Sequence, residues 1–408
     1  MVYDLANLAV VCLIVAAMVR RRGTAVFVTG ILLAHILLVF YTNDVLFPSR
    51  YFPDQFAYLD LTGRLRNLDF SSWASNFTTV RWSSLIFALS PVPFIVSVRS
   101  IALFNALLFC LLYFWLWGDG RLKRPASEAF FLFYPSLALY ATLAHRDLPV
   151  LVFMVAGAYL LVVKKNVFLS ILVMAPTLLL RKQAFFAFLT AAAVSRFISG
   201  NRKRNAWVLL AVSVVGVMGI SIVGQIKLGS INYEGQKAHL ENYPDLAGYK
   251  PYASGWEFLL ATLKGTPRFM AMPLPWEARN VWQAIQAVED GFILLAAVWL
   301  FSGIDPRKAR EGARELVFVA LFFLSGMLVH GALVINAGTA ARHRFPFIVV
   351  LFVFGELFRR DRMPAPGSDL FLSRYRKFGE APELPADRHL APPIEMKIAD
   401  SAPYRFLS

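Results

Sequence analysis

The chain has 408 residues, of which 58% are hydrophobic, and it carries a formal net charge of +15. No ordinary soluble domain has enough interior to bury so many apolar side chains, so we expect an integral membrane protein. The positive charge does not indicate a nucleic-acid partner, because most Lys and Arg residues lie in short joints between apolar stretches, as in membrane proteins.

Long apolar stretches recur along the chain, and several reach the roughly 17–25 residues that a helix needs to cross a bilayer. They predict an all-α, polytopic integral membrane domain over residues 1–358, with about eleven transmembrane helices. The expected spans are Leu5–Met18, Ala25–Tyr41, Pro93–Trp117, Ala129–Ala144, Leu148–Val163, Val167–Leu180, Ala184–Phe197, Ala206–Gly224, Gly291–Ser302, Leu316–Ile335 and Phe345–Phe358. Cys12 and Cys110 both lie inside apolar stretches, so we expect neither a disulfide framework nor a cysteine metal site.

Every second joint between these spans is basic, which fixes an expected orientation. Because Lys and Arg favour the cytoplasmic side, the N-terminus is expected outside and the C-terminus inside. Residues 359–408, rich in proline and charge, are expected to form a flexible cytoplasmic tail. The basic joints are Arg20–Arg22, Lys123–Arg124, Lys164–Lys165, Arg202–Arg204, Arg307–Arg314 and Arg359–Arg362.

The alternate joints, expected outside, include two larger loops at about residues 42–82 and 225–290 and three short joints around residues 145–147, 181–183 and 336–344. The short joints carry arginines against the topological preference, which suggests a compensating anionic partner. The planar guanidinium suits phosphate oxygens because it donates two parallel hydrogen bonds. The predicted phosphate ligands are Arg146, Arg181, Arg342 and Arg344.

Each of these arginines also has a purely structural interpretation, which stays open at this point. Arg342 and Arg344 are placed to snorkel from a helix end. Arg146 is placed to pair with the adjacent Asp147 at the membrane edge. Arg181 lies between two short spans that could form one bent hairpin.

Three residues of the outer joints are candidates for acid–base chemistry. Asp54 follows Pro53 at an expected helix start, where its carboxylate either caps the helix or takes a proton from a sugar hydroxyl. His145 and His343 lie beside the outer arginines, where each either takes part in proton transfer or has only a structural role. No separate cluster of metal ligands is present in the sequence, but a Mg²⁺ ion that bridges Asp54 and a lipid phosphate would need few protein ligands.

Four passages resemble bacterial inner-membrane proteins of surface-polysaccharide assembly, which are Wzy-like polymerases or multispanning GT-C-type glycosyltransferases. The passages are Pro53-Asp54-Gln55 with Tyr58, Tyr134-Pro135-Ser136 leading into Arg146-Asp147, Pro267-Arg268 through Pro273-Leu-Pro275-Trp276, and Asn336 through Arg344. The resemblance implies a polyprenyl-phosphate- or polyprenyl-diphosphate-linked saccharide as the substrate at the outer leaflet. It implies Asp54 as the base if the chain is GT-C-like, and outer arginines as diphosphate ligands if it is Wzy-like.

Aromatic side chains of the outer loops add a further expectation, since sugar rings stack on aromatic planes. Tyr58 and Trp276 are the expected sugar contacts, although Trp and Tyr also gather at membrane interfaces without any ligand. The expected function is glycosyl transfer, with other polysaccharide-assembly proteins as further partners. The alternatives are a flippase for lipid-linked sugars, which would need ionisable residues near span centres, and a structural scaffold.

Overall fold

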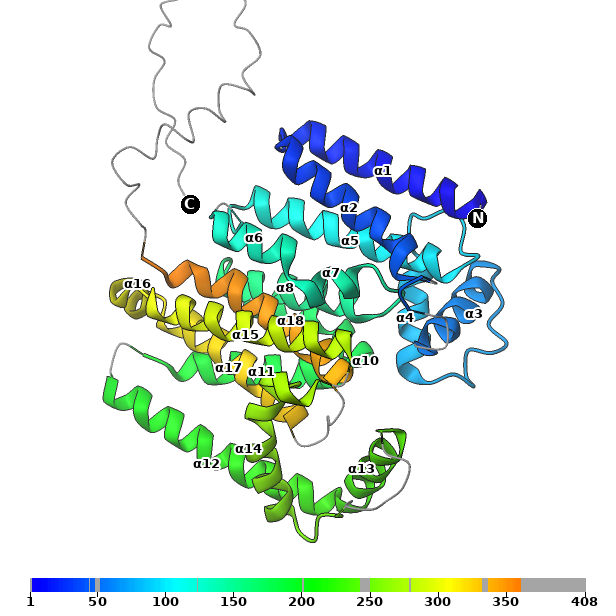
Figure 1. Cartoon of the computed structure of the whole chain (residues 1–408). Coiled ribbons are helices and arrows are strands. Elements are labelled where there is room, and N and C mark those ends of the chain that lie inside the picture. Colours follow the sequence, from blue (N-terminus) through cyan, green and yellow to red (C-terminus); the bar gives the residue numbers. More distant parts are fainter. Residues whose placement is uncertain are drawn as a thin grey trace, which may run out of the picture. The chain divides into compact units, whose positions relative to one another are not determined.

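The structure is a computed structural model that describes residues 2–43, 45–47, 52–122, 124–199, 202–242, 250–278, 280–331 and 337–360. The expected tail falls almost wholly outside these ranges. Within them the chain is helical and contains no β-strand, which confirms the all-α class. All of the described residues belong to one compact unit, Met1–Asp361 (Figure 1).

Four helices are long and apolar enough to cross a membrane: α1 Val2–Arg22, α5 Val98–Gly118, α15 Val281–Ser302 and α17 Ala313–Gly331. The other elements are α2 Val26–Thr42, α3 Asp54–Arg66, α4 Thr78–Ala88, α6 Pro125–Phe133, α7 Pro135–Ala141, α8 Asp147–Val162, α9 Val167–Met174, α10 Pro176–Leu180, α11 Lys182–Phe197, α12 Arg202–Ile226, α13 Leu228–Asn242, α14 Gly255–Ala271, η2 Pro275–Glu277, α16 Pro306–Glu311, α18 Ala337–Gly355 and η3 Glu356–Phe358. Length and composition therefore support an α-helical membrane protein, whereas the number of spans stays a prediction.

The expected span at residues 129–144 is divided into α6 and α7. Tyr134, between them, has an extended backbone (φ −66°, ψ 111°), because the ring of Pro135 excludes the helical region for the residue before it. Residues 142–146 are then non-helical, so their peptide groups need other partners inside the bundle. The Asn105 side chain donates to the carbonyls of Leu143 (2.7 Å) and His145 (2.8 Å), and the Asn43 side chain donates to that of Thr142 (2.8 Å). These amides hold the entry to α8 in place.

The first of the two larger loops, at about residues 42–82, contains a folded pair of helices, α3 and α4. Arg66, at the end of α3, closes the pair, because its guanidinium donates to the carbonyls of Ala88 (3.2 Å), Ser90 (2.7 Å) and Val92 (2.6 Å). Figure 1 shows this pair at the same end of the helices as the N-terminus of α1. Asp54, as the first residue of α3, is carried to that end.

The two sets of joints lie at opposite ends of the helices. Helix α8, for example, begins at Asp147 in an outer joint and ends beside the basic joint at Lys165. Contacts at the basic end join basic joints to one another: Arg124 with Glu356 (3.0 Å), Lys165 with Glu315 (2.9 Å), Lys308 with the carbonyl of Arg359 (3.1 Å), and Arg314 with the carbonyl of Ile198 (2.9 Å). The basic joints and the joints between them, which alternate along the sequence, therefore lie apart in the structure.

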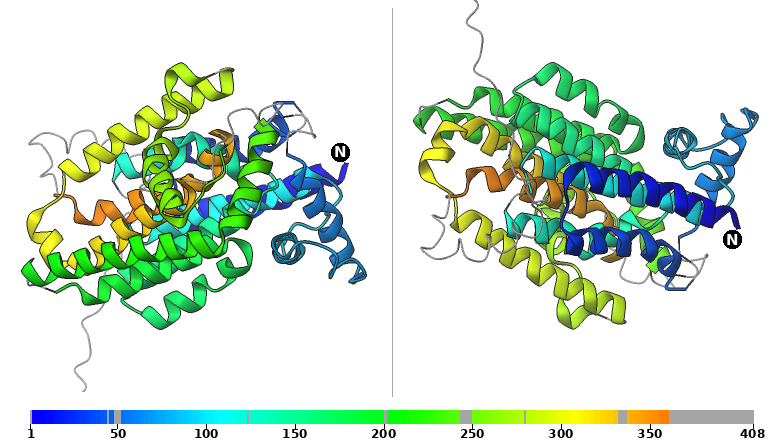
Figure 2. Two further views of the ribbon diagram at one scale, coloured as in Figure 1. Left: turned by 90° about the horizontal axis from the view of Figure 1, so that it is seen from below. Right: turned by 90° about the horizontal axis from the view of Figure 1, so that it is seen from above.

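Helix α15 presents an apolar stripe outward. Val281, Val288, Phe292, Leu295 and Val298 are each between 60% and 71% exposed, and they recur at helical spacing. Figure 2 shows α15 at the edge of the helices in both views. Such a face is unfavourable in water but matches lipid hydrocarbon, which again supports a membrane-embedded protein.

We expect single cysteines at the two ends to react from opposite sides of the membrane. Ser71, between α3 and α4, and Ser302, at the end of α15, are both exposed. In sealed membrane vesicles of one orientation, a membrane-impermeant maleimide should label S71C or S302C, but not both. The unsubstituted chain is the control, since Cys12 and Cys110 lie within apolar helices and should not react. Labelling of both variants from the same side would contradict the separation of the joints.

Candidate functional site

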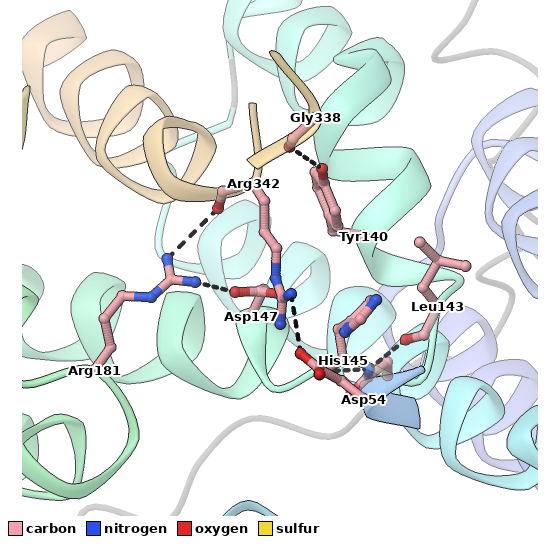
Figure 3. Close-up of polar contacts among 9 residues, drawn as sticks. Asp54, Tyr140, Leu143, His145, Asp147, Arg181, Gly338 and Arg342 are labelled. Atoms are coloured by element: carbon pink, nitrogen blue, oxygen red, sulfur yellow. Dashed lines mark hydrogen bonds and ion pairs between the residues drawn. The ribbon is translucent and has the colours of Figure 1, made fainter. Parts of the chain in front are cut away.

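The buried carboxylate of Asp147, in the first turn of α8, joins the three short joints that carry Arg146, Arg181 and Arg342 (Figure 3). Arg181, between α10 and α11, donates from its guanidinium to Oδ1 of Asp147. Arg342, in α18, donates from Nε to Oδ2 at 2.5 Å. Asp147 is fully buried and Arg181 is 3% exposed, so this network is shielded from solvent and sets the positions of both guanidinium groups.

Arg342 also connects the buried network to an exposed carboxylate. Its Nη1 lies 3.5 Å from Oδ2 of Asp54, whose side chain is 56% exposed, whereas the Arg342 side chain is 18% exposed. Asp54 is the first residue of α3, after the N-cap residue Pro53, so the alternative in which Asp54 is the N-cap is wrong. A carboxylate in the first helical turn is still favoured by the helix dipole. Asp54 is therefore accessible to a substrate and lies next to the Arg342 guanidinium.

Arg146 is the cation of this group whose charge is not paired. It is the N-cap residue of α8, and among the described residues no carboxylate lies within 4 Å of its guanidinium. The ion pair with Asp147 considered for it above is absent there, because Arg181 and Arg342 occupy both Asp147 oxygens. Three arginines (146, 181 and 342) therefore face two aspartates (54 and 147), which leaves one excess positive charge. We call these five residues the arginine cluster.

The two histidines are buried near this cluster. The ring of His145 packs edge-on against Phe52, with centroids 5.0 Å apart, and neither ring nitrogen has a hydrogen-bond partner in the described part of the chain. The ring of His343 packs against His330 at 4.4 Å, and its Nδ1 likewise lacks a partner there. Within the described ranges, neither ring is oriented by an acidic side chain, so the structure supplies no acid–base relay through them.

The structure separates Arg344 from the other three predicted phosphate ligands. Two residues along a helix correspond to about 200° of rotation, so Arg344 faces away from Arg342. It is fully buried and donates to the Asp290 carboxylate. It also donates to the carbonyls of Phe269 (3.1 Å), Met270 (3.2 Å) and Met272 (2.9 Å). Arg344 therefore joins α18 to α14 and α15, which is a structural task.

The predicted sugar contacts are not brought together either. Tyr58 is 1% exposed and packs edge-on against Phe87 between α3 and α4, with centroids 5.8 Å apart. Trp276, in η2, is 79% exposed. No pattern in the sequence points to Tyr140, whose hydroxyl donates to the Gly338 carbonyl (3.0 Å) beside Arg342 (Figure 3). Its relevance depends on a contact almost two hundred residues away.

The described residues contain no group of three or more His, Cys, Asp and Glu side chains arranged to hold a metal ion. Asp54 alone among the carboxylates of the arginine cluster is exposed enough to share an ion with a ligand. The chain matches no protein-family model, no curated protein and no solved structure. The site must therefore be interpreted from its own chemistry.

The cluster predicts an order of stabilities. The substitution D147L would leave two guanidinium groups without their shared acceptor, and breaking a buried pair in this way costs about 3–5 kcal/mol. R181L should cost less, because Arg342 still neutralises Asp147. D60L is the matched control, since Asp60 pairs with Arg64 at the surface, where such a pair contributes about 0.2–1 kcal/mol. Thermal unfolding in detergent measures all three, and equal losses for D147L and D60L would contradict the assigned role.

Proposed function

We propose that this chain is a bacterial inner-membrane glycosyltransferase or polysaccharide polymerase. It would act on polyprenyl-phosphate- or polyprenyl-diphosphate-linked sugars at the outer leaflet. In this proposal the chain crosses the membrane about eleven times, with the N-terminus outside and the C-terminus in the cytoplasm. The separation of the basic joints from the arginine cluster supports that orientation, since Lys and Arg gather on the cytoplasmic side.

The observation that carries the proposal is the excess positive charge of the arginine cluster at the end opposite to the basic joints. Arg146 has no paired carboxylate among the described residues, and Nη2 of Arg342 has no hydrogen-bond partner there. A phosphate would supply the negative charge that Arg146 lacks and a hydrogen-bond acceptor for Nη2 of Arg342. Asp147 accepts a hydrogen bond from Arg342 and is itself held by Arg181. Because the Arg342 side chain is already ordered, little side-chain entropy is lost when a phosphate binds.

The chemistry follows from the proximity of Asp54 to Arg342. A sugar hydroxyl oxygen would form a bond to the anomeric carbon of the donor, while the bond from that carbon to the phosphate oxygen breaks. The electron pair stays on the phosphate, where Arg342 and Arg146 stabilise the added charge. The hydroxyl proton passes to Asp54, 3.5 Å from Arg342. Asp147 and Arg181 are positioning residues, because they act through Arg342.

A Mg²⁺ ion shared by Asp54 and the phosphate fits the exposure of this carboxylate, and it would neutralise phosphate charge when bound. The arginine cluster performs its part of the reaction without it. His145 is buried beside the cluster and is assigned no proton transfer, since no described side chain orients its ring.

We expect D54N to lower the rate of transfer by about 10²–10⁴-fold, the usual contribution of a general base. R342A should lower it by about 10²–10³-fold through lost charge stabilisation. The assay uses proteoliposomes with a radiolabelled polyprenyl-diphosphate oligosaccharide and follows the labelled glycan product. R64A is the matched control, because Arg64 lies on the same helix as Asp54, toward its other end, and pairs with Asp60 at the surface.

The location of the unused precursor separates the proposed enzyme from its alternatives. Precursor that accumulates at the outer leaflet in cells expressing D54N or R342A supports transfer. Precursor held at the inner leaflet indicates a flippase. Unchanged glycan in both variants, with normal protein levels, would remove the arginine cluster from the reaction and leave a scaffold role.

A further inference from the structure

A groove of about 660 Å³ runs between α6 and α15, away from the arginine cluster. Its walls are almost entirely apolar and include Phe133, Val288 and Phe292, which are 56%, 60% and 68% exposed. Phe133 ends α6, and Val288 and Phe292 belong to the outward face of α15, so in a membrane the groove opens sideways toward lipid. An apolar groove in this position suits a hydrocarbon chain.

A second cavity of about 290 Å³ continues from one end of this groove. It shares Pro135, Ile285 and Glu289 with the groove, but it is more polar than the groove, because about half of its described lining residues carry hydrogen-bonding side chains. Its further lining includes Ser136, Asn280, Gln283, Gln286, Trp282 and Tyr140. Gly338 also lines it. The Gly338 carbonyl accepts from Tyr140, and Gly338 lies in the same helix as Arg342. The apolar groove, the polar cavity and the arginine cluster thus follow one another.

Glu289 stands where the apolar groove meets the polar cavity. Its side chain is 4% exposed. Ser136 and Tyr134 provide hydrogen-bonding groups next to its carboxyl group, whereas Oε1 has no hydrogen-bond partner in the described part of the chain. Because a buried acceptor without a partner is unfavourable, a ligand that donates a hydrogen bond to Oε1 would be stabilised there. This residue gives the junction a defined chemical preference.

The local charge determines which head group can bind at the junction. Glu289 and its neighbour Asp290 are both acidic, and Arg344 neutralises Asp290. No described cation lies within 4 Å of the Glu289 carboxyl group, so a phosphate is disfavoured at this poorly hydrated place. A hydroxyl is favoured because it donates a hydrogen bond and carries no charge. The junction and the arginine cluster therefore select opposite kinds of group.

We propose that the groove and the cavity together bind the acceptor of the reaction, an amphiphile with a hydrocarbon chain and an uncharged polyhydroxylated head. Its chain lies between α6 and α15, and a head-group hydroxyl donates to Glu289. The remainder of the head extends through the polar cavity toward Tyr140 and Arg342, where the donor phosphate is held. The role of this amphiphile as the acceptor rests on the proposed function, but its binding to the groove and the cavity does not depend on turnover.

The test compares two amphiphiles with the same chain, a decyl glycoside and a decyl phosphate, each with a diazirine in the chain. Photolabelling of the full-length protein in phosphatidylcholine nanodiscs, followed by peptide mass spectrometry, locates the chain. We expect the glycoside to label α6 and α15 at least about tenfold more than the phosphate does. E289L should lower glycoside labelling about tenfold, which corresponds to ~1.4 kcal/mol, and E289Q should retain most of it.

Two further variants keep the test decisive if E289L folds poorly. Ala296 lines the groove and Val298 faces outward on the same helix beyond it, so A296W should block glycoside labelling and V298W should not. R342A should leave glycoside labelling unchanged even if it abolishes transfer. Failure of the proposed function is therefore distinguishable from failure of the proposed binding. Equal labelling by the phosphate, or glycoside labelling indifferent to both E289L and A296W, overturns the inference.

Discussion

The architecture of the site depends on one buried carboxylate. Asp147 has no access to solvent, and its two oxygens accept from Arg181 and Arg342. A carboxylate in such a place is tolerable only because both cations are present, and each guanidinium is held in place by the carboxylate in return. This mutual dependence brings together the ends of α8, α10 and α18, which are far apart in sequence. It also leaves the outer edge of Arg342 directed at Asp54.

A second constraint is the non-helical backbone before α8. A continuous helix from α6 to α8 would satisfy its own peptide groups. It would, however, distribute the side chains of residues 142–146 around the helix axis. The chain breaks at Pro135 and again at residues 142–146, where Asn105 and Asn43 replace the missing backbone partners. Irregular backbone inside a membrane protein is confined to such protected places, which commonly line cavities. Here it positions Arg146 and Asp147.

The charged groups at this end of the helices form two neighbouring regions of opposite preference. The arginine cluster has an excess of cations, whereas Glu289 and Asp290 exceed the single Arg344. Tyr140 lies between them, since it lines the polar cavity and contacts Gly338 near Arg342. In the proposed transfer, the arginine cluster holds the phosphorylated donor and the acidic region faces the hydroxylated acceptor.

The sequence by itself determined the helical class, the alternation of basic and outer joints, and the gathering of Arg146, Arg181 and Arg342 at one end, because hydropathy and charge act locally along the chain. It placed Asp54 correctly at the start of a helix. It could not distinguish Arg344 from Arg342, since their different partners depend on which face of α18 meets α15. Glu289 and Tyr140 carried no local signal at all. Their importance arises only from helix packing, which decides which polar groups are buried together and which cavities they line.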